Sequence, residues 1–353
     1  MPLASFFHPK KSRFTPLLLA FGVSLLLTAC QNSLLTPSEQ PVITPAATPV
    51  APPATLSYTD ALGLTQKLPL TPQRVVSIFG SFAELWELAG GTLVGVTQDA
   101  IEENRLHNSP DATVIGTNKA PSSELLLALE PDLVILSADI PQQQELGELL
   151  QTGGIPHFYL KVESFEDYLG ALDICTQLTT HRELYDRHGT TVAAEIDELR
   201  QDIATWEEQH PLVLLIRAMS TTAKGKGADI NSGLMIQEMG GEHLVSRYPS
   251  LLEELSIEII LQDDPAYIFV ITMGDEEAAL QALSQIMLTH PAWRELTAIK
   301  EERCYLLPKH LFHFKPNAAW GEAYAFLAEI LYPGVRPHFR PLVEASILKQ
   351  DRP

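Results

Sequence analysis

Cysteine is scarce in this chain, which has only three in 353 residues, at Cys30, Cys175 and Cys304. This number and spacing exclude a disulfide framework and the clustered cysteines of a structural zinc or iron–sulfur site. Cys175 and Cys304 are far apart in the sequence. Their pairing in an oxidising compartment stays open at this point.

Positive charge is also in short supply. The formal net charge is −20 at pH 7, and residues 1–29 contribute three basic side chains and no acidic one, so the remainder carries −23. Nucleic-acid binding depends on neutralising phosphates with lysine and arginine, and we therefore expect no nucleic-acid partner. The balance suits a protein that meets basic partners or small ligands.

No apolar run is long enough to cross a bilayer comfortably. The longest, Leu17–Leu27, follows Lys10, Lys11 and Arg13 and leads into Leu-Thr-Ala-Cys30, so residues 1–29 read as an export signal. The end of this segment resembles the bacterial lipobox, which implies lipidation of Cys30; an ordinary signal peptide is the alternative. Residues 30–55 are rich in proline and polar residues and predict a semi-extended tether to the membrane.

Catalytic signatures are missing as well. Ser81 is not in a Gly-x-Ser-x-Gly elbow, and no His-Glu-x-x-His motif occurs. We therefore expect a protein that is not an enzyme and has no cofactor or bound metal of its own.

One phrase occurs twice. Glu124 precedes Pro131 by seven residues and Glu258 precedes Pro265 by seven, and each proline is followed by an apolar run. Proline stops a helix, and the run after it has the composition of a strand buried on both faces. The repeat predicts two similar α/β lobes.

Strand and helix patterns alternate through both halves, which is typical of parallel sheets covered by helices. We expect an N-terminal lobe over residues 56–163, connecting helices over 164–209, a C-terminal lobe over 210–337 and a polar tail over 338–353. The longest helix is expected at Glu183–Glu208, with an interruption at Gly189. In the second lobe, Arg217–Asn231 reads as a polar loop and Leu244–Val245 as a short strand.

From about Arg74 to Pro333 the chain resembles the helical-backbone (class III) periplasmic binding proteins, the substrate-binding lipoproteins of ABC importers for ferric siderophores, haem and cobalamin. The resemblance is carried by short pieces in a fixed order: Arg74-Val-Val-Ser, Leu93-Val-Gly-Val96, Glu124–Leu136, Pro291-Ala-Trp293-Arg-Glu-Leu296, Ala298-Ile-Lys300, Cys304-Tyr-Leu306 and Trp320–Leu331.

The resemblance implies an α/β fold of two Rossmann-like lobes with parallel sheets, joined by a single long helix, with ligand held between the lobes. It implies that Glu124 and Glu258 dock on arginines of the membrane permease; the alternative is that both are ordinary first-turn helix acids. The expected cargo is a ferric chelate. Haem or a corrinoid is the alternative cargo, and a nitrogenase-like enzyme and a lipid-anchored adhesin or scaffold are rivals of other classes. We expect a monomer in the cell envelope, with its globular part in the periplasm or outside the cell membrane.

Ligands of open parallel sheets lie beyond the carboxyl ends of the strands. On that rule the predicted ligand-binding residues are Phe79, Ser81, Gln98, Thr117, Asn118 and Asp139 in the first lobe, and Arg217, Ser220, Asn231 and Met273 in the second. Arg217 is the best single candidate, because an arginine at a strand end can grip a carboxylate with two hydrogen bonds.

The segment after the last strand adds His310, Phe312, His313 and Lys315 to the predicted ligand contacts. Its rings would pack on a macrocycle or catechol, and Lys315 supplies a cation. A loop is expected here because of Pro316. If Phe312 instead belongs to the core, its ring would not reach a ligand.

Overall fold

The structure, a computed structural model, describes residues 54–206, 210–313 and 315–334. The predicted signal segment, the lipidation site Cys30, the predicted tail and almost all of the predicted tether lie outside these residues. Within the described part of the chain, no helix has the length and apolar character needed to cross a membrane.

The N-terminal half is built on a parallel sheet preceded by a hairpin. The antiparallel hairpin consists of β1 (Thr55–Thr59) and β2 (Thr65–Pro69). The sheet has the strand order β5-β4-β3-β8-β9, and all of its pairings are parallel. Its strands are β3 (Val75–Ser77), β4 (Gly95–Val96), β5 (Thr113–Val114), β8 (Leu133–Ser137) and β9 (His157–Leu160).

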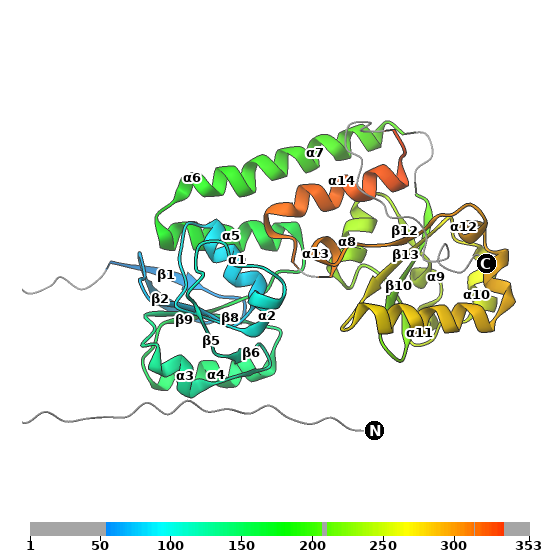
Figure 1. The fold of residues 1–353 in the computed structure, drawn as a ribbon. Coiled ribbons are helices and arrows are strands. Elements are labelled where there is room, and N and C mark those ends of the chain that lie inside the picture. Colours follow the sequence, from blue (N-terminus) through cyan, green and yellow to red (C-terminus); the bar gives the residue numbers. More distant parts are fainter. Residues whose placement is uncertain (1–53, 207–209, 314, 335–353) are drawn as a thin grey trace, which may run out of the picture. The chain divides into compact units, whose positions relative to one another are not determined.

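Helices cover both faces of this sheet, as the alternation of strands and helices predicts (Figure 1). Residues of opposite parity along β8 enter different cores: Ile135 packs with α1 and α5, whereas Val134 and Leu136 pack with α3 and α4. Every residue of β8 is buried, which explains the apolar run Leu133–Leu136 at its start. The helices are α1 (Gly80–Leu88), α2 (Gln98–Glu102), α3 (Ser123–Ala128), α4 (Pro141–Thr152) and α5 (Phe165–Thr179); between α2 and α3 lies a small ribbon of β6 (Gly116–Thr117) and β7 (Ala120–Pro121).

The predicted long helix is present but changes character in the middle. It runs as α6 (Arg182–Tyr185), a π-helical turn η1 (Asp186–Thr190) and α7 (Thr191–Ala204), with helical backbone across both junctions. Gly189 lies in the π turn, where a Cβ would come within 3.1 Å of Leu169. The helix ends at Ala204 rather than Glu208. The last helix, α14 (Trp320–Leu331), packs along α7.

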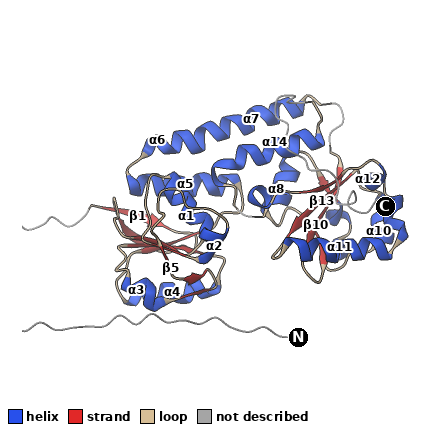
Figure 2. Cartoon of the chain, viewed as in Figure 1, coloured by secondary structure: helices blue, strands red, loops and turns tan. Residues whose placement is uncertain are grey.

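The C-terminal half has a second sheet with the order β11-β10-β13-β14, and β12 also pairs with β10. Its strands are β10 (Leu212–Ala218), β11 (Ala223–Lys226), β12 (Glu242–His243), β13 (Tyr267–Thr272) and β14 (Cys304–Leu306). A turn joins β10 to β11, and the later strands are connected by helices (Figure 2): α8 (Asn231–Glu238), α9 (Leu244–Arg247), η2 (Pro249–Leu252), α10 (Ile257–Asp263), α11 (Glu276–Thr289), η3 (Pro291–Glu295) and α12 (Thr297–Lys300). After β14 come α13 (Lys309–Phe312) and η4 (Asn317–Ala319).

Three local predictions in this half are wrong. The polar stretch Arg217–Asn231 is not one loop, because residues 217 and 218 complete β10 and Ala223–Lys226 forms β11 antiparallel to it. Leu244–Val245 begins a helix, and the short strand lies just before it. The segment from Lys309 to Phe312 is a one-turn helix rather than a loop.

The two cysteines within the described residues, Cys175 and Cys304, are both free and buried. Cys175 lies in α5, and Cys304 begins β14. The disulfide that the sequence left open is therefore not formed. Burial raises the pKa of Cys304 to about 12, which makes its thiol unreactive at neutral pH.

Candidate functional site: the carboxyl ends of two parallel sheets

The repeated phrase folds alike in both halves. Ser122 caps α3 by accepting a hydrogen bond from the Leu125 N–H, and Ser256 caps α10 by accepting one from the Ile259 N–H. Before each proline the backbone turns into the left-handed region, at Glu130 (φ 46°) and at Asp264 (φ 42°). A capped first turn and a left-handed exit before proline define the same short helix twice.

Glu124 and Glu258 occupy the second position of these matched helices, and both are exposed. Glu258 accepts a hydrogen bond from the Ser256 hydroxyl at 2.9 Å and lies 3.6 Å from His290. Hydrogen bonds from its own backbone N–H and from Ser256 hold the pKa of Glu258 below its usual range. The bland alternative, a first-turn acid favoured by the helix dipole, agrees with these contacts equally well.

At the carboxyl ends of the first sheet, polar side chains join neighbouring loops. Asp99 accepts hydrogen bonds from the Gly80 N–H at 2.7 Å and from the Asn118 amide at 3.3 Å. The backbones approach so closely that a Cβ on Gly80 would lie 2.8 Å from the Ala100 nitrogen. The loops after β3 and β4 and the β6–β7 ribbon therefore form one connected wall.

Gln143 is the residue at this wall that sequence reasoning missed. Its side chain is completely buried. It accepts from the Ser137 N–H at 2.7 Å and donates to the carbonyls of Ile78 at 2.8 Å and Asn118 at 2.9 Å. The available signal was a glutamine in the first turn of a helix beside the strand ends, where a buried polar group must find partners.

Two of the predicted ligand-binding residues, one in each half, have buried side chains. Ser81 is 2% exposed, because α1 begins at Gly80 and turns this side chain inward. Phe312 is 1% exposed and packs against Phe326 with ring centroids 5.5 Å apart. Neither side chain has surface to offer a ligand in this structure, so both expectations need correction.

The other predicted residues of the first sheet keep accessible surface, and several have partners. Gln98 donates to Glu102 at 2.5 Å. Thr117 accepts from the Ala120 N–H at 3.1 Å, and Asp139 lies 3.6 Å from Lys161. Phe79 is half-buried and packs against the ring of Phe82 at 5.0 Å.

Arg217 lies inside β10 rather than after it, paired with Ile271 and Lys224 in the neighbouring strands. Its Nε is buried and has no hydrogen-bond partner among the described residues. Burial lowers the pKa of Arg217, and the carboxylate of Asp229 opposes this shift only in part. A half-buried guanidinium without an ion-pair partner is a candidate anion site.

The remaining predicted residues of the second sheet lie at its ends. Ser220 is exposed in the β10–β11 turn, and Asn231 is the half-buried first residue of α8. Met273 is 38% exposed just after β13. His310 is exposed on α13.

His313 and Lys315 are influenced by charged side chains of different halves. The pKa of His313 is lowered to about 4, first by burial and then by the positive charges of Lys309 and Arg217. Burial also lowers the pKa of Lys315, and carboxylates at the ends of the first sheet, Asp139 foremost, act in the opposite direction. His313 and Lys315, two residues apart, thus interact electrostatically with charged groups of different halves.

Hydrogen bonds hold Asn317 on the first half. It is 1% exposed, and its amide donates to the Ser81 carbonyl at 2.9 Å and to Glu84 at 2.7 Å. Arg105 donates to Glu84 at 2.5 Å and to the Lys315 carbonyl at 3.1 Å. The backbone position of Lys315 is therefore set by a buried polar network.

No group of three or more histidine, cysteine, aspartate or glutamate side chains is arranged to hold a metal ion in the described ranges. The strand ends instead offer cations, hydroxyls and amides, which are groups that recognise carboxylates and oxyanions.

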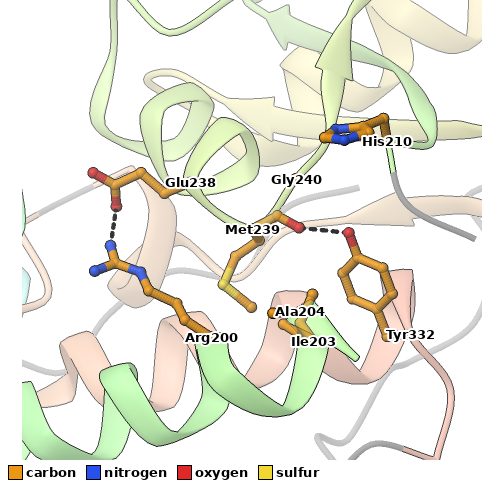
Figure 3. A pocket seen from close by; sticks show the side chains of 8 residues that line it. All are labelled: Arg200, Ile203, Ala204, His210, Glu238, Met239, Gly240 and Tyr332. Carbon is orange, nitrogen blue, oxygen red and sulfur yellow. Dashed lines mark hydrogen bonds and ion pairs between the residues drawn. The ribbon is translucent and has the colours of Figure 1, made fainter. Parts of the chain in front are cut away.

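A separate pocket of about 170 Å³ lies where α7, α8 and α14 meet (Figure 3). Several of its polar groups pair with each other: Arg200 pairs with Glu238 at 2.8 Å, and the Tyr332 hydroxyl donates to the Met239 carbonyl at 2.7 Å. None of the predicted ligand residues lines this pocket. It reads as a packing gap between structural helices.

Comparison with known proteins gives a consistent result. The sequence model of the periplasmic binding protein family matches residues 75–311. The chain is 24% identical over 244 residues to the Fe(3+)-citrate-binding protein YfmC of Bacillus subtilis, covering 67% of this chain and 73% of that protein. It is 24% identical over 251 residues to the Fe(3+) dicitrate-binding periplasmic protein FecB of Escherichia coli, covering 68% and 78%.

Among solved structures, a periplasmic heme binding protein from Pseudomonas aeruginosa superposes with a TM-score of 0.62 at 20% identity, covering 78% of this chain and 98% of that chain. At this identity the likeness bears on the fold. It agrees with two α/β lobes built on parallel sheets.

Proposed function

Because the chain belongs to the periplasmic binding protein family, we propose that it binds an anionic ferric chelate of the carboxylate type between its two sets of strand ends. It would then deliver the chelate to the permease of an ABC importer. The role we propose is capture and delivery without chemistry on the cargo. The ferric citrate binders among its relatives support a chelate of this kind.

The observation that supports the proposal concerns the surroundings of two cationic side chains. Arg217 and Lys315 are both partly buried, yet neither has a carboxylate within ion-pair distance among the residues that the structure describes. Burying a cation without a partner costs free energy, and the protein has 44 acidic side chains with which to pair it. A ligand that brings its own negative charge would compensate both groups at once.

The test is cargo selectivity of the full chain. Ferric citrate, a neutral ferric hydroxamate and haem are titrated while intrinsic tryptophan fluorescence and thermal stability are followed. A saturating cargo at about 100 times its dissociation constant should raise stability by about 2.7 kcal/mol. We expect ferric citrate to respond and the neutral chelate to respond weakly. A response to the neutral chelate alone, or no response to any chelate, contradicts the proposal.

Haem is the second candidate. His310 on α13 and His313 at its end are one turn apart, and a histidine can ligate haem iron. Haem also carries two carboxylates for Arg217 and Lys315. A Soret shift that His310→Ala abolishes and that ferric citrate does not displace would favour haem over citrate.

Docking on the permease is assigned to Glu124 and Glu258. Matched caps and matched left-handed exits support the idea that the two carboxylates are equivalent positions of one repeated device. An exposed ion pair is worth only about 0.2–1 kcal/mol, so two pairs would set register more than affinity.

We expect Glu124→Gln plus Glu258→Gln to keep cargo affinity and to lower iron uptake by cells. The control is Glu166→Gln plus Asp186→Asn, which removes two other exposed carboxylates, from α5 and η1. Equal uptake by the docking variant and the control would refute the assignment.

Attachment to the membrane is proposed to run through a lipid on Cys30, with the folded part held in the cell envelope as a monomer. The sequence before Cys30 supports this proposal, although the site lies outside the described residues. Several acyl chains hold a protein firmly, at about 0.8 kcal/mol per buried CH₂. Cys30→Ser should release the protein from the membrane fraction; retention in that fraction would show that the cysteine is not the anchor.

A further inference from the structure

Helix α3 exposes apolar side chains beside its docking carboxylate. Leu125 is 46% exposed and Leu127 43% exposed, whereas Leu126 between them is completely buried. At 100° per residue, Glu124, Leu127 and Ala128 share one face of the helix and Leu125 borders it. The face that carries Glu124 is therefore largely apolar.

The matched helix α10 does not share this feature. Ile259 and Leu261, the counterparts of Leu125 and Leu127, are partly buried and pack against the core of the second sheet. Both helices start on a serine cap and end in the same left-handed turn, so their backbones do not explain the difference. The repeat is symmetric in its backbone and asymmetric in its surface.

The two carboxylates differ in the same sense. Glu258 is held by Ser256 and lies near His290. Within the described part of the chain, the Glu124 carboxylate has no hydrogen bond and no ion pair. The first helix thus presents an unpaired acid flanked by exposed leucines, and the second presents a restrained acid on a covered surface.

We propose that Leu125 and Leu127 form an apolar anchor that, together with Glu124, binds an apolar surface next to a basic side chain on the outer face of the importer permease. This inference rests on the proposed docking function and adds that the first half supplies most of the affinity. The leucines share one helical turn with Glu124, so their apolar surface is continuous with the proposed docking site.

Charge argues against two other occupants. A second copy of this chain meeting the same face would place Glu124 near its own equivalent, and like charges repel. An anionic lipid surface would meet Glu124 and the exposed Glu130 of a chain whose net charge is −20. A partner with a positive side chain inside an apolar surface satisfies both features of the helix.

The experiment measures binding of the full chain to the importer permease in lipid nanodiscs. Leu125→Ala plus Leu127→Ala should weaken binding about tenfold per leucine, since each loses apolar burial worth about 25 cal/mol per Å². Alanine is a strong helix former, so we expect the helix to persist, and an unchanged affinity for ferric citrate checks the fold. The matched control is Leu64→Ala, a leucine 47% exposed in the β1–β2 hairpin, which should bind as the wild type does.

Salt separates the two parts of the anchor. At about 1 M salt, exposed ion pairs are screened, and the loss caused by Glu124→Gln should shrink while the loss caused by the leucine variant persists. Permease binding by the leucine variant that equals the control overturns the inference. So does an equal loss of binding to nanodiscs that contain lipid alone, or a wild-type dimer in sedimentation that the variant lacks.

The failure of this inference is distinguishable from failure of the proposed function. If the chain binds ferric citrate and the permease, and the leucines prove neutral, only the apolar anchor is lost. If no chelate binds but the permease does, the cargo proposal fails and the anchor stands. If the wild type does not bind the permease, the anchor is overturned together with docking.

Discussion

Arg217→Gln should weaken binding of ferric citrate and at the same time stabilise the cargo-free protein. Among the residues that the structure describes, the Arg217 Nε is buried without a hydrogen-bond partner, and the positive charges of Lys309 and Arg217 both lower the pKa of His313. The guanidinium therefore lies desolvated in a region that already holds positive charge. Glutamine keeps much of the length of the side chain and removes the charge.

The magnitude on cargo follows from the bond that is lost. A hydrogen bond to a charged group contributes about 1.5–3 kcal/mol, which corresponds to a loss of affinity of about 10- to 150-fold. Arg217→Lys keeps the charge but loses the two-pronged geometry and should lie between the wild type and Arg217→Gln. The control, Arg187→Gln, removes an exposed arginine from the π turn and should leave affinity unchanged.

Calorimetric titration with ferric citrate and thermal melting without cargo measure the two effects on the same samples. Removing a buried charge that lacks a partner should raise the melting temperature of the cargo-free protein. A variant with wild-type affinity would refute the role of Arg217 in binding. A variant that loses affinity and also melts lower would mean that the arginine is structural.

Three further predictions concern the same region. In the folded chain the pKa of His313 is about 4, whereas in the unfolded chain it is near 6.5, so the free energy of unfolding should fall by roughly 2–3 kcal/mol as the pH drops from about 6.5 to about 4. Denaturation at several pH values should show a weaker pH dependence of stability for His313→Asn, and the same dependence as in the wild type would contradict this account. Asn317→Ala should cost about 1–3 kcal/mol of unfolding free energy in urea, because the Ser81 carbonyl and Glu84 each lose a donor; an unchanged midpoint would refute it. Gln143→Leu should destabilise the protein by a similar amount and weaken ferric citrate binding, because the loops that Gln143 holds together would move. The control Gln144→Leu, at the exposed neighbouring position, should lower stability less, and equal effects of the two variants would count against the role of Gln143.

Much of the fold followed from patterns that the sequence displays openly. The apolar run at Leu133–Leu136 and the prolines after the repeated helices correctly predict β8 and β13. β11 was missed because its buried positions are Ala223 and Gly225 rather than branched residues. A Cβ at Gly225 would lie 2.7 Å from Val245, so close packing there requires a residue that carries no strand signal.

The candidate site was predictable only as a set of strand ends. The rule that ligands lie beyond the carboxyl ends of parallel strands selected Asn118 and Asp139, which follow strands, and also Arg217, which instead lies within β10. The rule says nothing of which way each side chain points. Whether Ser81 faced outward depended on where α1 begins: the helix starts at Gly80 and includes Ser81 in its first turn. Gln143 escaped notice because its three backbone partners come from segments up to 65 residues away.

The path of the chain through its largest core has a consequence for folding. That core joins Phe82 and Trp86 of α1 to Trp320 and Tyr324 of α14, so the first-formed sheet depends on helices made almost last. Trp320 contacts Phe165 with ring centroids 5.9 Å apart. The residues of the second sheet thus lie, along the sequence, between two parts of this core, and the core is complete only when residues beyond 315 are present. A chain that folds from its N-terminus must therefore leave that first body incomplete until residues beyond 315 are available, and a cut after β14 would damage both halves.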